Sequence, residues 1–482
     1  MRTIRVIAIF ALLTSSLCKV NGQNFRDVYD NFTKTAQDSY RTFRDSLNSE
    51  FARTISSNWE QFQTSEPENS SASPQPVSPT VAGESDKSSN VTLKASETVD
   101  TLELSIYPEQ FVTHSSASVA NGRVIRFQFF DSEQDVSIPA EYGIFHPLGI
   151  SESEVARFWR RLGKENYSQI LSKIEDNRKF LGYNDWASLI WIQTLASAIF
   201  PQNINSERTI FEVFVLNQMG LMAKLARSGD RLECLFASVQ PVYARKYTVI
   251  DTYQYYFADS STSASSIYTY RSDFSGMLRP LDLRIKNPIQ LGTRDSYISR
   301  DFKSRVLGCV LDIPINQALM KFYESYPQTS VNVYAQSSPD SRFSSCLLGQ
   351  IGARLEQMDG PDKIDELLRF VQFEFSYKLD SEQFGYEKQF FCEENFFYAA
   401  NDCEDRAILF SFLVRHLTGN KVLLVEYDDH IATAVRFDRE RKGNYFKRDD
   451  GIYYICDPTF IGATVGMCMP KYIDKKARIY VL

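Results

Sequence analysis

The chain has few cysteines and few histidines, and it has no hydrophobic run long enough to span a membrane. Its 482 residues include 8 Cys and 4 His, and its net charge is -7. The cysteines are too few for a disulfide scaffold, because such scaffolds are small and dense in cysteine. The acidic balance argues against nucleic acid as a partner, since phosphate binding needs a basic surface. Any histidine-dependent reaction must use His114, His146, His416 or His430.

Residues 1–22 have the pattern of a secretory signal peptide. Arg2 and Arg5 form a basic start, residues 6–13 are apolar, and small residues precede the expected cleavage point. The apolar run is far shorter than the roughly 20 residues of a spanning helix, so we expect no transmembrane span in the mature chain. The protein is then exported to the periplasm or cell envelope, or secreted. Cleavage removes Cys18 and leaves seven of the eight cysteines, so at least one thiol has no partner within the chain.

Two segments connect this leader to the globular part. Over residues 23–62, apolar residues recur at steps of three and four, which predicts a long amphipathic helix. This helix either docks on its own globular domain or serves self-association, a partner helix or an envelope surface. Residues 63–98 are rich in Ser and Pro and poor in apolar residues. They cannot bury enough apolar surface to offset the entropy of ordering, so we expect a disordered linker.

The remaining chain is expected to give an α+β protein of two α/β-type modules, residues 99–305 and 306–482. Alternation predicts strands at 102–106 and 124–129, and helical periodicity follows from 151 to 200. The second module is helical again in its first half.

The residues that carry chemistry lie near the C-terminus. Asn401 or Asp402 is a good N-cap for an apolar helix over 406–417, which puts Cys403 in the first turn. There the helix dipole favours a thiolate and lowers the thiol pKa, although Glu404 and Asp405 oppose this. The alternative is a buried, inert cysteine.

Two short strands follow that helix and carry an imidazole and a carboxylate. His430 begins a strand after a tight turn, and Asp457 ends the strand over 451–457. Alternation puts Asp457 on the opposite face from Cys456, so His430 and Asp457 can face each other across paired strands. A thiol nucleophile, an imidazole base and an orienting carboxylate are the groups that acyl-transfer chemistry needs.

These residues resemble the transglutaminase-like cysteine-enzyme superfamily. The similarity covers about residues 360–482 and rests on Asp402-Cys403-Glu404-Asp405-Arg406-Ala407 at a helix start, His430 at a strand start, Asp457-Pro458-Thr459 at a strand end, and the lead-in Phe373-Glu374-Phe375-Ser376-Tyr377. The arrangement is similar to exported proteins of unknown role in Bacteroidetes-type bacteria. The aromatic residue that usually follows the histidine in this family is absent, because Ile431-Ala432-Thr433 stands there.

The resemblance implies a papain-like α+β core, with a cysteine-bearing helix packed on an antiparallel sheet, and acyl-enzyme chemistry on a protein or peptide substrate. Cys403 would be the nucleophile, His430 the base and Asp457 the orienting acid. The oxyanion hole would use the Cys403 amide and one upstream donor, for which Gln389 and Asn395 are candidates. The activity would be peptide hydrolysis, deamidation or transfer to an amine, with no cofactor. The alternative is a non-catalytic envelope scaffold that uses this fold for binding.

The other histidines and cysteines have simpler readings. His416 suits a helix C-terminus, and His146 and His114 lie in loops. Zinc binding by Cys392, Cys403, His430 and Cys456 is disfavoured, since no metal-ligand spacing is present. A disulfide within the set Cys392, Cys456 and Cys468 stays open.

A second helix-strand-turn unit in the first module loosely parallels the cysteine region. The segment from Ser206 to Gly220 matches the one from Cys403 to Gly419, and Arg231-Leu232 stands in the place of His430. Either the first module is a degenerate copy that has lost its thiol and imidazole, or the likeness is a coincidence.

Overall fold

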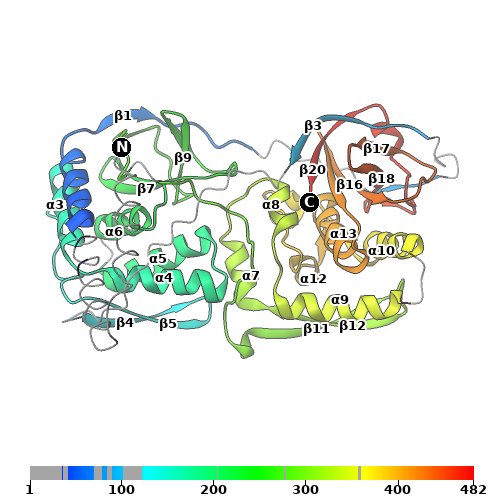
Figure 1. Cartoon of the computed structure of the whole chain (residues 1–482), viewed down its shortest axis with the longest axis horizontal. Helices are drawn as coiled ribbons and strands as arrows, with labels where there is room; N and C mark the ends of the chain where they lie inside the picture. The colour runs from blue at the N-terminus through cyan, green and yellow to red at the C-terminus, as the bar shows by residue number, and fades with distance from the viewer. Residues whose placement is uncertain are drawn as a thin grey trace, which may run out of the picture.

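The computed structural model describes residues 35, 39, 42–69, 79–83, 90–100, 122–202, 205–275, 278–356 and 360–482. These residues form an α+β protein with two lobes side by side (Figure 1). The expected leader at 1–22 and the expected strand at 102–106 lie outside the described residues. The described helices include none with the length and hydrophobicity of a membrane span.

The first lobe is built on a six-stranded sheet of order β1-β10-β6-β7-β9-β8. Every neighbouring pair is antiparallel. Helix α6 (Asn205–Gln218) packs on the face of this sheet that carries Leu232 and Phe236. The strands are β1 (Glu60–Gln63), β6 (Ala223–Ser228), β7 (Arg231–Ala237), β8 (Tyr247–Ile250), β9 (Tyr253–Phe257) and β10 (Ser266–Thr269).

Helices α3 (Glu152–Lys164), α4 (Ser168–Leu181) and α5 (Asp185–Ile199) complete the first lobe, together with the hairpin of β4 (Gly122–Phe129) and β5 (Ser132–Pro139). The expected strand at 124–129 and the helices within 151–200 are therefore confirmed. Ser151 caps α3 by accepting a hydrogen bond from the Glu154 amide (3.4 Å), and Asn184 caps α5 through the Ala187 amide (3.0 Å).

The second lobe has a six-stranded sheet of order β17-β18-β16-β15-β20-β3. Helix α13 (Cys403–Thr418) packs on β15 and β16, and α7, α8, α9, α10, α11 and α12 precede it in the chain. The strands are β3 (Lys94–Asp100), β15 (Val422–Tyr427), β16 (His430–Phe437), β17 (Tyr445–Arg448), β18 (Gly451–Cys456) and β20 (Lys476–Val481), and the helices are α7 (Gln317–Glu324), α8 (Val331–Gln336), α9 (Ser341–Leu355), α10 (Gly360–Glu374), α11 (Asp380–Gln383) and α12 (Glu394–Phe397).

The two sheets have the same strand order when each is read from its packing helix. In the first lobe α6 is followed by β6 and β7; the β8–β9 hairpin lies beside β7, and β10 lies on the other side of β6. In the second lobe α13 is followed by β15 and β16; the β17–β18 hairpin lies beside β16, and β20 lies on the other side of β15. Both central hairpins have two-residue turns, which pair Ser228 with Arg231 and Tyr427 with His430. Each packing helix is followed by a glycine with positive φ, Gly220 (81°) and Gly419 (71°).

The boundary expected between residues 305 and 306 falls inside a hairpin. Strand β11 (Tyr297–Ser304) pairs along its whole length with β12 (Cys309–Asn316). This hairpin lies beside α9 in the second lobe (Figure 1). The second lobe thus begins before residue 297, because a strand cannot be separated from its hydrogen-bonded partner.

The amphipathic helix expected over 23–62 is shorter at its C-terminal end. The helix in the described part of this segment ends at residue 54, and residues 60–63 form β1, which pairs with β10. Phe51 lies 4.9 Å from Trp159 and 5.5 Å from Tyr270 between ring centroids, and Ile55 is fully buried. The described part of this helix therefore docks on its own lobe.

The segment expected to be a disordered linker, 63–98, includes strands of both lobes. The Ser65 amide donates to the Tyr247 carbonyl (2.7 Å), strand β2 (Thr80–Val81) pairs with β19 (Phe460–Ile461), and β3 pairs with β20 in parallel. Composition missed this pairing because an added edge strand is held by backbone hydrogen bonds and keeps polar side chains in solvent.

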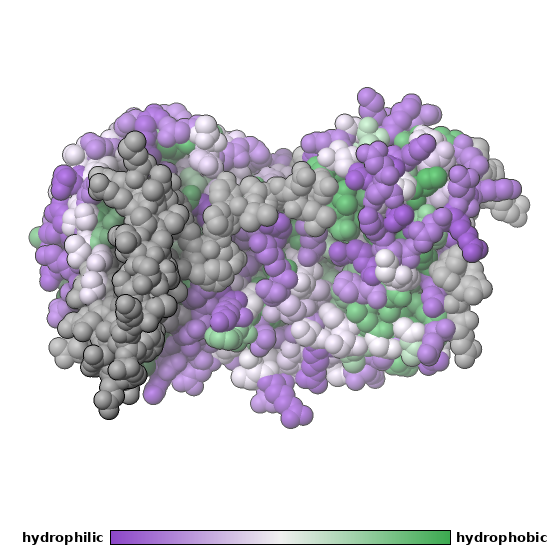
Figure 2. Space-filling model, in the orientation of Figure 1, coloured by the Kyte–Doolittle hydropathy of each residue, from purple (hydrophilic) through white to green (hydrophobic). Residues whose placement is uncertain are grey.

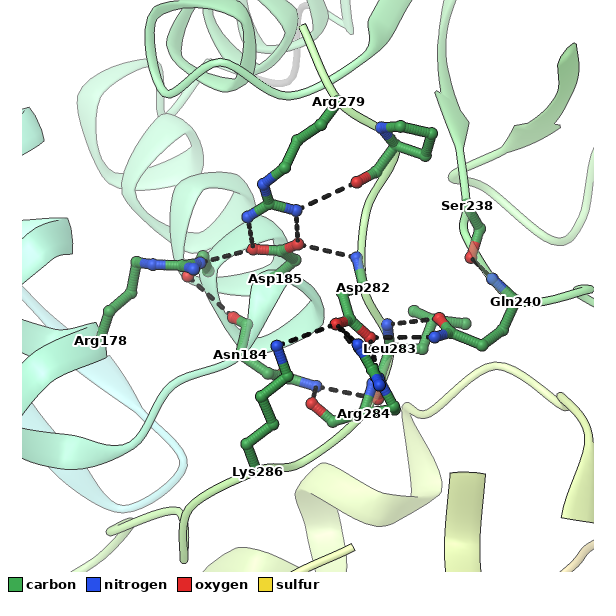
Figure 3. A network of polar contacts seen from close by, with 12 residues as sticks. Arg178, Asn184, Asp185, Ser238, Gln240, Arg279, Asp282, Leu283, Arg284 and Lys286 are labelled. Atoms are coloured by element: carbon green, nitrogen blue, oxygen red, sulfur yellow. Dashed lines mark hydrogen bonds and ion pairs between the residues drawn. The ribbon is translucent and has the colours of Figure 1, made fainter. Parts of the chain in front are cut away.

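A buried acidic group fixes the segment that runs from the first lobe towards the second (Figure 3). Asp185 pairs with Arg178 (2.5 Å) and Arg279 (2.5 Å) and accepts a hydrogen bond from the Asp282 amide (2.7 Å). Burial alone would raise the pKa of Asp185, but the two guanidinium groups and the amide reverse this and hold the pKa well below its usual range. The side-chain amide of the neighbouring Asn184 donates a hydrogen bond to the hydroxyl of Tyr326 (2.7 Å), a residue just beyond α7.

Candidate active site

Cys403 begins α13, as the N-cap pattern predicts, and it is fully buried. The Asp402 amide donates to Asp405 Oδ2 (3.3 Å), which ties the residue before the helix to its first turn. Arg406 is also buried; its guanidinium donates to Asn401 Oδ1 (2.9 Å) and to the Phe375 carbonyl (2.7 Å). These contacts fix the direction in which the helix N-terminus points.

His430 and Asp457 form a buried pair across β16 and the end of β18. His430 Nε2 lies 2.8 Å from Asp457 Oδ2, and Asp457 Oδ1 accepts a hydrogen bond from the Thr459 amide (2.9 Å). With the carboxylate as acceptor, Nε2 carries the hydrogen and Nδ1 presents its lone pair. Nδ1 has no hydrogen-bond partner in the described part of the chain. The ring stacks on Tyr472 at a centroid distance of 5.1 Å and an interplanar angle of 11°.

The thiol of Cys403 lies next to the strand that carries this imidazole. The Ile431 amide, one residue after His430, hydrogen-bonds the sulfur and lowers the thiol pKa slightly. The thiol itself donates to Glu404 Oε2 (3.0 Å), and the structure has no hydrogen bond between the described side chains of Cys403 and His430. The three predicted residues therefore gather around one helix terminus, with the thiol turned towards Glu404.

The expected lowering of the Cys403 pKa is wrong for this geometry. Burial raises the pKa well above its usual value, and the charges of Glu404 and Asp402 raise it further. A helix dipole contributes about 0.3–1 kcal/mol, less than one pKa unit. Burial beside carboxylates outweighs that contribution, so the resting thiol holds its proton.

The two carboxylates that act on the thiol, Asp402 and Glu404, form a group with Asp380 that the sequence did not single out. Ligand atoms of Asp380, Asp402 and Glu404 lie within 4.8 Å of one another, and all three residues are buried. Oxygen ligands of this kind suit a hard divalent cation. Burial, followed by the charge of Glu404, raises the pKa of Asp380 to about 8, and burial also raises the pKa of Asp402. Protons shared among these carboxylates therefore also explain how the three groups can lie so close together. No local sequence signal connects Asp380 to the other two.

The two oxyanion candidates differ in their contacts. Asn395 is engaged on both sides: its amide donates to the Cys392 carbonyl (3.4 Å) and its Oδ1 accepts from Asn401 (2.7 Å). Gln389 is buried, and its Oε1 has no partner among the described residues. The next amide, of Phe390, donates to Asp405 Oδ1 (2.8 Å) and anchors this loop to the first turn of α13.

The remaining histidines take part in ordinary contacts. His416 Nδ1 lies 2.8 Å from the Phe412 carbonyl near the end of α13, and His146 Nδ1 lies 2.8 Å from Glu207 Oε1. His114 lies outside the described residues.

The cysteines of the described residues form no disulfide, so the bridge considered among Cys392, Cys456 and Cys468 is not present. Cys456 belongs to the core on the helix side of the second sheet, and Cys468 to the core on the other side. The metal-ligand grouping that the described residues form is the carboxylate set, and it includes none of the four residues considered for zinc.

The first lobe has a charged pair at the position of His430 and Asp457. In the β7–β9 register Leu235 pairs with Phe257, as Ala434 pairs with Ile455 between β16 and β18. Counting on from these pairs places Arg231 at the His430 position and Asp259 at the Asp457 position. Arg231 Nη2 lies 3.5 Å from Asp259 Oδ2, and both side chains are largely exposed.

The sequence alignment of α6 with α13, which set Ser206 against Cys403, needs a shift of two residues. Counted back from Gly220 and Gly419, the position of Cys403 corresponds to Ile204, which lies outside the described residues. Ser206 then corresponds to Asp405.

Comparison with known proteins adds no relative: no family model matches this chain, and neither does a curated protein or a solved structure.

Proposed function

We propose that the second lobe is a transglutaminase-like cysteine enzyme of an exported protein, which acts on amide bonds through an acyl-thioester. The observation that carries the proposal is the buried His430–Asp457 pair, whose Nδ1 lies unpartnered beside the helix that begins at Cys403. A papain-like core is the architecture we assign to α13 and the sheet of β15, β16 and β18.

The reaction begins when the thiol proton passes from Sγ to His430 Nδ1. Sγ then attacks the carbonyl carbon, and the oxyanion is held by the Cys403 amide with Gln389 as the second donor. Collapse breaks the C–N bond, and the amine leaves with the proton from Nδ1. Water or a second amine next attacks the thioester, gives its proton to Nδ1 and releases Sγ, which regains that proton.

The resting geometry makes this reaction conditional on a rearrangement. Cys403 and His430 are both 0% exposed, and the thiol proton is held by Glu404. The substrate must therefore open the site and turn the thiol from Glu404 towards Nδ1. A rotation about the Cα–Cβ bond of Cys403 is the smallest movement that does this.

The same closure supports a second candidate function, a binding scaffold without catalysis. A buried thiol with a raised pKa is inert as long as the site stays closed. The first lobe supports this alternative too. We infer from its matching strand order that it is a copy of the same module, and it carries Arg231 where the second lobe has an imidazole.

Acylation by p-nitrophenyl acetate separates the two candidates. The enzyme predicts a burst of p-nitrophenolate equal to one acyl group per chain, and His430→Ala should slow it by about 10²–10⁴-fold. Cys456→Ala is the matched control, since Cys456 is a buried thiol of the same lobe with a raised pKa and should leave the burst unchanged. No burst from the wild-type chain, or one that survives in His430→Ala, would establish the scaffold instead.

A further inference from the structure

A cavity of about 460 Å³ opens in the first lobe beside the residue that corresponds to His430. Three elements form its wall: α5, the first half of α6 and the start of β7. The side chains that matter for its chemistry are Gln193 and Ser197 on α5, Arg208, Thr209 and Glu212 on α6, and Arg231 on β7. The cavity therefore lies beside the Arg231–Asp259 pair, at the position that His430 and Asp457 occupy in the second lobe.

Two guanidinium groups enter this cavity from different elements. Arg208 is held in place because its Nε donates to the Phe200 carbonyl (2.9 Å) and its Nη2 to the Pro201 carbonyl (3.3 Å). Arg231 comes from β7, and its side chain is 53% exposed beside Asp259. Guanidinium groups pair well with carboxylates, so two of them in the lining of one cavity favour a carboxylate ligand.

The acidic group in the wall does not cancel this positive character. Glu212 is buried and accepts a hydrogen bond from Gln193 Nε2 (2.6 Å). Burial raises the pKa of Glu212 to about 7, so a large share of these groups is neutral at neutral pH. Two other acidic residues lie close to Arg231, and neither is part of the wall: Asp259 pairs with it at 3.5 Å, and burial raises the pKa of Glu233.

We propose that this cavity is a binding site for a carboxylate-bearing ligand of about dipeptide size. Its volume lies within the range of about 300–1,000 Å³ that small-molecule sites occupy. The carboxylate belongs either to the C-terminus of a peptide or to a free small acid. The inference concerns the first lobe alone and does not rest on acyl transfer in the second.

Isothermal titration of the full-length chain with N-acetyl-alanyl-alanine, its C-terminal amide and acetate tests the proposal. The free acid should bind at least tenfold more tightly than the amide. Arg231→Gln should weaken binding by about 10–100-fold, the value of one charge-assisted contact. Arg271→Gln is the matched control: Arg271 lies in the same lobe, is 52% exposed and is also paired with carboxylates. Binding to Arg271→Gln and to His430→Ala should match the wild type.

Three results overturn the site, and the acetate titration distinguishes its two possible ligands. If acid and amide bind equally, or if Arg231→Gln and Arg271→Gln have equal effects, then the ligand's carboxylate does not contact Arg231. Binding that is lost in His430→Ala but kept in Arg231→Gln places the ligand in the second lobe. Acetate binding as tightly as the dipeptide assigns the site to a free small acid, and much weaker acetate binding assigns it to a peptide terminus.

Discussion

The two lobes place different side chains on the same hairpin geometry. At the start of β16 the second lobe has His430, fully buried and 2.8 Å from Asp457; at the start of β7 the first lobe has Arg231, half-exposed and 3.5 Å from Asp259. A two-residue turn precedes each of them. The comparison shows that strand register sets which residues meet, while burial and residue type decide whether they form a buried imidazole–carboxylate pair or a surface ion pair.

The lobes also differ in what surrounds these pairs. In the second lobe Tyr472 covers the imidazole and the carboxylates of Glu404 and Asp402 lie beside the thiol, whereas in the first lobe the corresponding place opens into a cavity. On the coloured part of the face shown in Figure 2, hydrophilic residues predominate over both lobes, with hydrophobic residues in small groups between them.

The largest expected effect comes from neutralising the carboxylate of each pair. Asp457→Asn should slow acylation by p-nitrophenyl acetate by about 10²–10⁴-fold, because an amide no longer fixes the imidazole tautomer. Asp259→Asn in the first lobe should leave the rate unchanged. Stopped-flow release of p-nitrophenolate measures both, and equal effects of the two substitutions would erase the distinction between the lobes.

Asp185→Asn should produce the next largest effect, on stability. Removing one partner of a buried charge network costs about 3–5 kcal/mol. Because the folded-state pKa of Asp185 is depressed, its contribution is complete above the usual Asp pKa of about 4 and is lost as the pH falls below it. Urea unfolding at pH 7 and pH 3 measures this. Asp131→Asn, in an exposed pair with Lys321, should cost about 0–1 kcal/mol, and a similar cost for both would refute the assigned role of Asp185.

Each lobe has a buried thiol whose pKa is raised first by burial and then by a nearby glutamate, Glu404 for Cys403 and Glu212 for Cys234. Glu404→Gln and Glu212→Gln should each lower the pKa of the corresponding thiol. Iodoacetamide alkylation of that thiol at fixed pH should rise by about tenfold, the change that one pKa unit gives. Only Glu404→Gln should also speed acylation. Faster acylation in Glu212→Gln would mean that the first lobe takes part in the reaction.

The smallest expected effect concerns the hydroxyl of Tyr472, which donates to Asp429 Oδ1 (2.8 Å). Tyr472→Phe should cost about 0.5–1.5 kcal/mol of unfolding free energy. The acylation rate should stay the same, because the ring still stacks on His430. Tyr480→Phe is the control, since its hydroxyl donates to Glu426 at the same distance. A tenfold slower acylation in Tyr472→Phe alone would assign the hydroxyl a chemical role.

Local sequence signals were enough to locate the three residues of the candidate site. The N-cap pattern before Cys403, the turn before His430 and the alternation up to Asp457 each act within a few residues, and the structure brings all three to one helix terminus. The place of Arg231 in the first lobe was also readable, because the turn lengths match.

Contacts between distant segments were not readable in the same way. Tyr472 and Asp380 reach the site from segments with no periodic link to it, and β3 joins the second sheet although it precedes the whole first lobe. The pKa of Cys403 was misjudged for a related reason. The dipole is a property of one helix, while the burial that raises the thiol pKa depends on tertiary packing.

The central claim is that Cys403, assisted by His430, forms an acyl-thioester. Peptide mass spectrometry of the chain after a brief reaction with p-nitrophenyl acetate tests it most directly, because it identifies the acylated thiol among the seven cysteines of the described residues. The account predicts acetylation of Cys403 in the wild type and its loss in His430→Ala. Acetyl groups spread over several cysteines, or a Cys403 adduct that persists without the imidazole, would contradict it.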